Sequence, residues 1–97
     1  MILHTICSGP DSSAVDDCLR ILAAEDAVLL LGNGVYCGLS GTTTATQLAT
    51  SGHRIYVLEQ DLHAAGAAGR TDTSVSVIGF DGFVELTEAF AQHLNWA

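Results

Sequence analysis

The sequence contains no lysine, and its only basic residues besides histidine are Arg20, Arg54 and Arg70. Against eleven acidic residues they leave a formal net charge of −8. A surface that grips nucleic acid needs clustered lysine and arginine to displace the counterions of the phosphate backbone. We therefore expect no direct nucleic-acid binding, and any RNA on the pathway must be held by another protein.

Paired cysteines are also lacking. Cys7, Cys18 and Cys37 are odd in number and form no C-x-x-C motif, which argues against a disulfide framework and a four-ligand zinc site. The default is free thiols in a reducing compartment. No nucleophile elbow supports a serine–histidine–acid triad, and no H-x₃-H pair occurs among the four histidines, which are His4, His53, His63 and His93. We expect neither a bound metal nor a cofactor.

Long apolar runs are absent as well. No stretch approaches the roughly 18 apolar residues of a membrane span, and residues 1–4 (MILH) lack the basic start of a signal peptide. We expect a cytoplasmic protein without a membrane partner. Yet the chain is 48% hydrophobic, with a mean hydropathy of +0.36, which is apolar for one small domain spanning residues 1–97. Either both faces of a sheet are covered, or apolar surface is buried against another subunit.

Short apolar strands alternate with helical patterns along the chain. Residues 27–31 (AVLLL) are continuously apolar, which is typical of a parallel strand covered on both faces. The remaining pattern predicts strands at 2–7, 54–58 and 74–78, and helices at about 14–24, 35–39, 42–50, 61–65 and 79–93. The last helix is predicted from apolar residues at helical spacing, namely Phe83, Leu86, Phe90 and Leu94. The alternation indicates an α/β layered fold with a mostly parallel sheet.

The turn after the second strand, GNGVYCG, resembles a phosphate-binding loop at first sight. In a dinucleotide fingerprint, G-x-G-x-x-G, Cys37 stands where the third glycine belongs, and a Walker loop needs the missing lysine. We interpret the stretch as a tight turn in which Asn33 and Gly34 supply positive φ. Phosphate binding is the alternative interpretation.

Cys18 is the candidate functional residue. It is predicted in the second turn of the first helix, near the carboxyl edge of the sheet, where α/β folds bind ligands. A helix N-terminus lowers the pKa of a thiol, whereas the neighbouring Asp16 and Asp17 act the other way. Its alignment with Val15 and Leu22 favours burial in the core.

Several stretches occur together in a known order: ILHT, SGP, DDCLRIL, LLLGNGVYCGLSGT, IYVLEQDLHAAG, VSVIGFDGFVELT and NWA. In this order they resemble the TusB/DsrH family of small sulfur-relay subunits over essentially the whole chain. The resemblance implies a three-layer α/β/α fold of the DsrE/F/H type, with a mostly parallel sheet of four to five strands. It also implies a heterohexamer with two homologous DsrE/F-like chains, two copies of each.

Such a complex takes persulfide sulfur from an upstream carrier protein and passes it to a downstream one. The sulfur goes toward C2 of the tRNA wobble uridine, the branch we favour, or into dissimilatory sulfur oxidation. The main persulfide cysteine belongs to a partner subunit, so the resemblance implies an accessory, mainly structural chain rather than a catalytic one.

The resemblance also bears on single residues. Cys18 falls where some family members carry a cysteine in the first helix, which makes it the candidate persulfide carrier, and we expect it to be labelled faster than Cys7. Cys7 and Cys37 have no such match and are interpreted as packing residues. The chain departs from the family pattern in the segment 61–66 (DLHAAG), with alanine where arginine is common, and at Gly79, which replaces an acid.

A second hypothesis belongs to a different class. The chain would then be a free-standing, homo-oligomeric α/β module that binds a small ligand at the turn of residues 32–41. The two hypotheses differ in what the protein needs from its neighbours, because a relay subunit requires homologous partner chains and the module does not.

Overall fold

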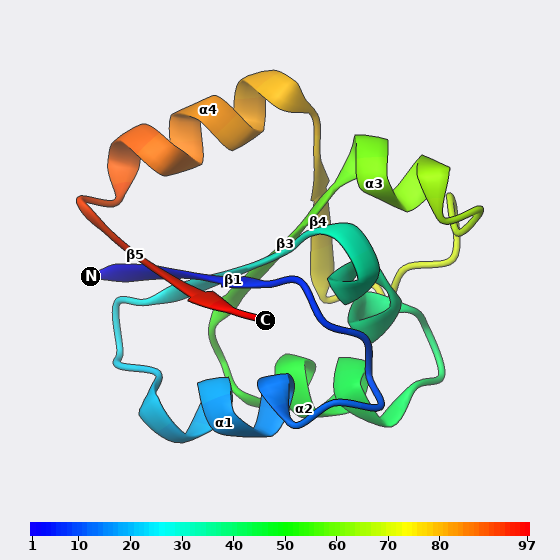
Figure 1. Cartoon of the computed structure of the whole chain (residues 1–97), viewed down its shortest axis with the longest axis horizontal. Coiled ribbons are helices and arrows are strands. Elements are labelled where there is room, and N and C mark those ends of the chain that lie inside the picture. Colours follow the sequence, from blue (N-terminus) through cyan, green and yellow to red (C-terminus); the bar gives the residue numbers. More distant parts are fainter.

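A five-stranded, all-parallel sheet forms the centre of the molecule, and the computed structural model describes all 97 residues (Figure 1). The strands lie in the order β4-β3-β2-β1-β5. Their bounds are Ile2–Ile6 for β1, Ala27–Leu30 for β2, Arg54–Leu58 for β3, Val75–Ile78 for β4 and Gln92–Trp96 for β5. The predicted α/β class with a parallel sheet of four to five strands is confirmed.

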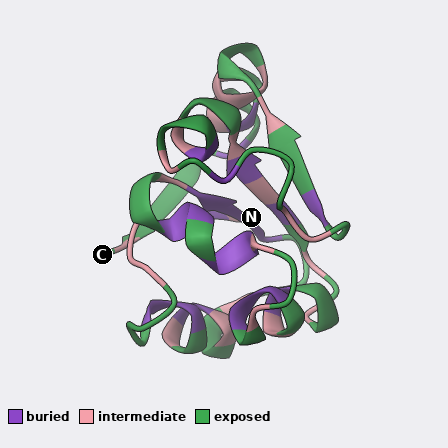
Figure 2. Cartoon of the chain, turned by 90° about the vertical axis from the view of Figure 1, so that its right-hand side faces the viewer, coloured by how far each residue is buried: buried purple, intermediate pink, exposed green.

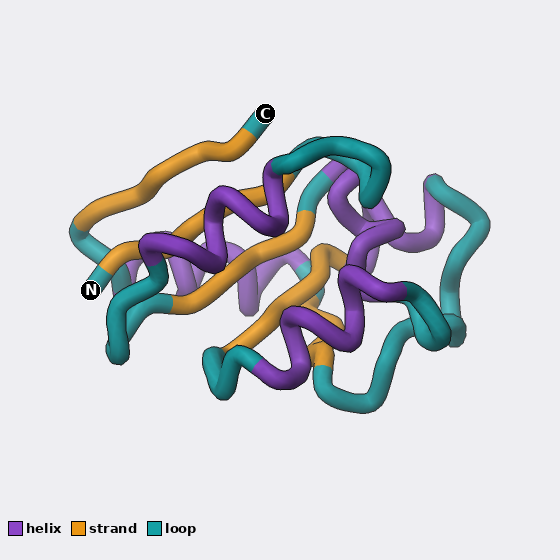
Figure 3. The backbone as a smooth tube through the Cα atoms, turned by 90° about the horizontal axis from the view of Figure 1, so that it is seen from below, coloured by secondary structure: helices purple, strands orange, loops and turns teal.

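Helices lie on both faces of this sheet, as the three-layer prediction requires. Figures 1 and 3 show α1 and α2 together on one face, with α4 across the other. The helices are α1 (Ala14–Ile21), the 3₁₀ helix η1 (Gly32–Gly38), α2 (Thr43–Thr50), α3 (Glu59–Ala64) and α4 (Phe80–Ala89). None of them has the length and apolar character of a membrane span.

The two faces of the sheet are covered unequally. Fourteen buried residues form the core on the side of α1 and α2, whereas five form the core beneath α4. Strand β2 is buried along its whole length, but β5 is exposed at four of its five residues (Figure 2). The sheet is therefore well packed at its centre and lightly covered toward its edges.

The prediction of a helix over residues 79–93 is wrong at its C-terminal end. Helix α4 stops at Ala89 because Phe90 takes an extended conformation, with φ −108° and ψ 117°. The chain then forms β5 in parallel register with β1, where Gln92 lies opposite Ile2 and Trp96 opposite Ile6. Pairing with β1 overrides the helical spacing of Leu94, whose side chain is exposed on the strand.

Helix α1 also ends earlier than predicted, at Ile21 rather than near Ala24. Leu22 is extended, and the backbone N–H of Ala23 donates to the carboxylate of Asp26 at 3.0 Å instead of to a helical carbonyl. A side chain in the turn before β2 thus takes over the backbone donor that would have continued the helix.

Asp26 is the centre of a buried polar network. Besides Ala23, its carboxylate accepts a hydrogen bond from the N–H of Ile2 at 2.8 Å, and it lies 2.9 Å from Nε2 of the fully buried His4. The other ring nitrogen of His4, Nδ1, accepts from the indole N–H of Trp96 at 3.1 Å. The network therefore joins β1, the turn before β2 and the end of β5.

The same contacts set the charge state of Asp26. Burial acts to raise its pKa, but the hydrogen bonds from Ala23, His4 and Ile2 outweigh it and lower the pKa to about 2. The folded protein therefore binds this proton less tightly than the unfolded chain does. The contribution to stability is complete above pH 3.8, the ordinary pKa, and is lost as the pH falls toward 2.

We expect Asp26→Asn to lower the free energy of unfolding at pH 7 by about 2–4 kcal/mol, because a buried charged acceptor is removed from three donors. The difference from the wild type should shrink as the pH falls from 4 to 2, because the unfolded wild-type chain takes up this proton near pH 3.8, whereas the folded protein takes it up only near pH 2. Urea unfolding across this range measures it. Glu25→Gln, at the neighbouring exposed residue, serves as the control, and an equal loss in both variants would contradict the assignment.

Candidate functional site

The carboxyl edge of the sheet is where functional groups gather. All five strands are parallel, so their C-terminal ends meet along one edge, and ligands of open α/β sheets bind there. The strand order reverses at β1, since β2, β3 and β4 lie on one side of it and β5 on the other. Cys7 follows β1 at this edge, η1 follows β2 and α3 follows β3.

Glycines let η1 approach β1 closely. Gly32 has a φ of +50°, whereas Gly34 lies in a region open to other residues, so the prediction that Asn33 and Gly34 supply positive φ is wrong. Gly34 is needed for space instead: a Cβ on it would overlap the backbone carbonyl of Ile6. Gly32 is thus needed for its positive φ, and Gly34 is needed because it has no side chain.

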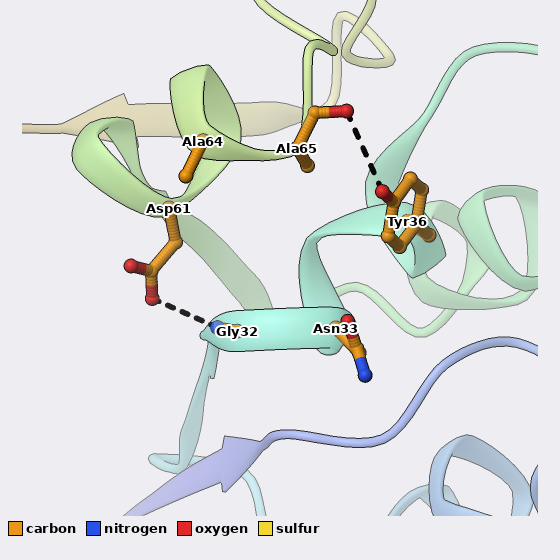
Figure 4. A pocket seen from close by; sticks show the side chains of 6 residues that line it. All are labelled: Gly32, Asn33, Tyr36, Asp61, Ala64 and Ala65. Carbon is orange, nitrogen blue, oxygen red and sulfur yellow. Dashed lines mark hydrogen bonds between the residues drawn. The ribbon is translucent and has the colours of Figure 1, made fainter.

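Between η1 and α3 lies an open hollow of about 210 Å³ (Figure 4). Asp61 accepts a hydrogen bond from the N–H of Gly32 at 2.8 Å, and the hydroxyl of Tyr36 donates to the carbonyl of Ala65 at 3.4 Å. The remaining lining residues are Asn33 and Ala64. A carboxylate already occupies the backbone donor that a phosphate would need, and it would repel an anion. This geometry argues against a phosphate site.

The helical thiols lie inside the protein. Cys18 is a residue of α1 and is fully buried. Burial, together with the nearby charge of Asp26, raises the pKa of its thiol to about 12. Cys37 is also fully buried in η1, and burial raises its pKa to about 11. At neutral pH both are held as thiols rather than as reactive thiolates.

Cys7 is the most accessible of the three cysteines, being only partly buried. Its thiol donates to the side-chain carbonyl of Asn95 at 3.3 Å, and the hydroxyl of Thr5 donates to the same oxygen at 2.9 Å. The burial of Cys18 and the partial exposure of Cys7 argue against the expectation that Cys18 is labelled faster than Cys7.

The histidines are dispersed, and no group of three or more His, Cys, Asp or Glu side chains gathers as a metal site would require. His53 bridges the carbonyls of Ser51 and Ala23, and His93 contacts the carbonyl of Phe90. The sequence alone suggests no role for His4. Its partners Asp26 and Trp96 lie far from it in the chain, so no local motif indicates the network.

A second hollow, of about 270 Å³, opens beside α4. Arg54, at the start of β3, places its guanidinium 5.5 Å from the ring centre of Phe90, a cation–π geometry. This hollow is lined by residues of β3, β4 and α4 together with Phe90, and neither Cys7 nor η1 contributes to it.

A family model described as DsrH like protein matches residues 8–93. Proteins named TusB from Serratia proteamaculans and Pectobacterium atrosepticum are each 36% identical over 95 residues, and one from Erwinia tasmaniensis is 34% identical. Each alignment covers 98% of this chain and all of the relative.

Solved structures share the fold. A protein of unknown function, MTH1491 from Methanobacterium thermoautotrophicum, superposes with a TM-score of 0.72 at 19% identity, covering 97% of this chain and 96% of that one. Protein Tm0979 from Thermotoga maritima gives a TM-score of 0.68 at 26% identity, covering 92% and 93%.

We expect Gly34→Ala to lower the free energy of unfolding by about 3 kcal/mol or more, because the added methyl group collides with backbone that a rotamer change cannot move. Gly79→Ala is the matched control, since a Cβ there meets no atom within 4 Å, and it should change stability by less than about 1 kcal/mol. Denaturant unfolding measures both. A Gly34→Ala protein as stable as the control would contradict the close approach.

For the thiols, we expect iodoacetamide to label native Cys7 first, with Cys18 and Cys37 slower by about 100-fold or more, because they are buried and protonated. Peptide mass spectrometry over a time course measures the order, and unfolded protein should label at all three sites at similar rates. Cys7→Ser should abolish the fast phase. Fast labelling of Cys18 in the native protein would overturn this order.

Proposed function

The chain belongs to the DsrH-like family, and from this membership we propose that it is a subunit of a sulfur-relay complex. The observation that carries the proposal is the match over almost the whole chain to relatives named TusB. Its motifs resemble the same family in the same order. A full-length match supports a shared role more strongly than a shared fold does, because folds host many functions.

Two pathways are open to such a subunit. The curated relatives above bear the name TusB, which favours the branch that delivers sulfur to C2 of the tRNA wobble uridine. The alternative is the dissimilatory sulfur-oxidation branch. In either branch the chain works in the cytoplasm, and the strongly negative charge supports leaving the RNA to another protein.

Within the complex we propose an accessory role between two homologous DsrE/F-like chains in a heterohexamer. Exposed apolar side chains support the proposal that part of this surface binds a partner chain. Phe80 is 70% exposed at the start of α4, and Val77 is 43% exposed on the edge strand β4. The light cover of the α4 face favours the same conclusion.

The persulfide at Cys18 stays a prediction. Its thiol is fully buried and its pKa is raised, so a donor persulfide reaches it only if α1 moves away from the sheet. We propose that sulfur is carried chiefly by a partner subunit, and that Cys18 takes part only in an opened state of this chain.

The alternative of a free-standing ligand-binding module is favoured by one observation, the hollow between η1 and α3. It is small, open and lined by one carboxylate, so its ligand would be small and neutral or cationic. This alternative predicts that the chain binds its ligand without any homologous partner.

The test is co-expression with two homologous DsrE/F-like chains, followed by native mass spectrometry. We expect a complex with two copies of each chain, and Phe80→Asp should weaken assembly by introducing a charge into an apolar contact. Asp81→Asn, at the next exposed residue, is the control. A protein that stays monomeric in the presence of both partners would contradict the proposal.

The assembled complex also tests the sulfur path. After incubation with a persulfidated donor, the mass of each subunit is followed over time. Sulfur adds about 32 Da to a persulfidated chain. We expect this increment chiefly on a partner subunit. If it appears on this chain and is lost in Cys18→Ser, Cys18 is a carrier, and if it appears on no subunit, the relay function is wrong.

A further inference from the structure

The three-residue network of His4, Asp26 and Trp96 has only one arrangement of protons. An indole N–H donates and cannot accept, so Nδ1 of His4 must be the acceptor in the 3.1 Å contact with Trp96. The proton of a neutral His4 therefore sits on Nε2, which donates to Asp26 at 2.9 Å. His4 is fully buried, and every polar atom in the network has a partner.

Adding a proton to His4 changes one side of this network only. An imidazolium donates from both nitrogens. Its Nε2–H still suits the carboxylate of Asp26, and the opposite charges attract. Its Nδ1–H, however, would point at the N–H of Trp96, so that two donors face each other. Protonation therefore keeps the contact with Asp26 and breaks the contact with Trp96.

Strand β5 pairs with β1 along its whole length, and Trp96 is its one residue that is not exposed. The strand lies at the edge of the sheet and pairs only with β1. The carbonyl of Trp96 accepts the N–H of Cys7 at 3.0 Å, and Asn95 accepts the thiol of Cys7. An edge strand with few buried contacts is the part of a fold that opens most readily.

We propose that the end of β5 is a proton-sensitive latch: it docks when His4 is neutral and is released when His4 takes up a proton, uncovering Cys7. The proton comes from solvent and forms a new N–H bond at Nδ1, and no bond between heavy atoms forms or breaks.

The charged and titratable groups around the latch are few. Asp26 faces His4 from the turn before β2, and the N-terminal amine lies 3.9 Å from the same carboxylate. From α1, the buried Cys18 thiol is near enough to feel the charge of Asp26. Two other histidines lie close by, His93 on β5 and His53, which contacts the carbonyl of Ala23. The experiment must distinguish the effect of protonating His4 from that of protonating His53 or His93.

The chain carries its own reporter, because Trp96 is its only tryptophan. The experiment follows Trp96 fluorescence and the amide hydrogen exchange of residues 94–97 in the full-length protein from pH 8 to pH 5, with exchange corrected for intrinsic rates. We expect a reversible change in emission and a loss of protection of about tenfold or more in β5, while β2 stays protected.

His4→Gln is the decisive variant, since its amide offers a donor and an acceptor but takes up no proton in this range. It should keep β5 docked and show no transition. His53→Gln and His93→Gln should retain the transition of the wild type. An unchanged Trp96 signal in the wild type, or an unchanged transition in His4→Gln, would overturn the proposal.

Trp96→Phe covers the case in which His4→Gln does not fold. It removes the donor that conflicts with a protonated His4, so the exchange of β5 should no longer depend on pH, whatever its level of protection. A Trp96→Phe protein that keeps the wild-type dependence on pH would show that the latch is not the cause. Neither measurement requires partner chains, so the result is separate from that of the sulfur-relay proposal.

Discussion

One carboxylate, shielded from water, holds together parts of the chain that are distant in sequence. Asp26 accepts hydrogen bonds from the start of β1 and from the turn that ends α1, and through the ring of His4 it fixes the indole of Trp96 in β5. The end of the first helix depends on it, because the N–H of Ala23 donates to this carboxylate. Because every donor in this network is satisfied, removing one member leaves a buried polar group without a partner.

The packing around this network divides the three thiols by their environment. The dense core beneath α1 and α2 encloses Cys18 and Cys37, keeping both protonated, whereas Cys7 lies at the lightly packed junction of β1 and β5. These environments are compatible with the accessory role proposed above. Cys7 is therefore the thiol most open to reaction, and Asn95 on the edge strand β5 contacts it.

The sequence predicted the central part of the fold because that part is encoded locally. The apolar run before Gly32 and the strand beginning at Arg54 carry patterns that no distant contact has to supply. Strand β5 could not be predicted in this way. Its residues are exposed and Leu94 continues the spacing of α4, so only pairing with β1, about ninety residues away, decides its conformation. The role of His4 was missed for the same reason, since both its partners are remote. In the turn after β2, the sequence indicates that glycines are needed. Whether Gly32 or Gly34 has a positive φ depends on the position of β1, which the sequence of the turn does not contain.

The pairing of β1 with β5 has a consequence for protein synthesis. A ribosome adds about 5–20 residues per second, so β1 leaves it roughly 5–20 seconds before β5 does. During this interval the edge of β1 that β5 later covers is open, and His4 has no indole to bind. Strand edges of this kind are open to pairing with other chains. A nascent chain of this protein therefore passes through a stage in which a chaperone or a freshly made homologous subunit finds an unfilled place in its sheet.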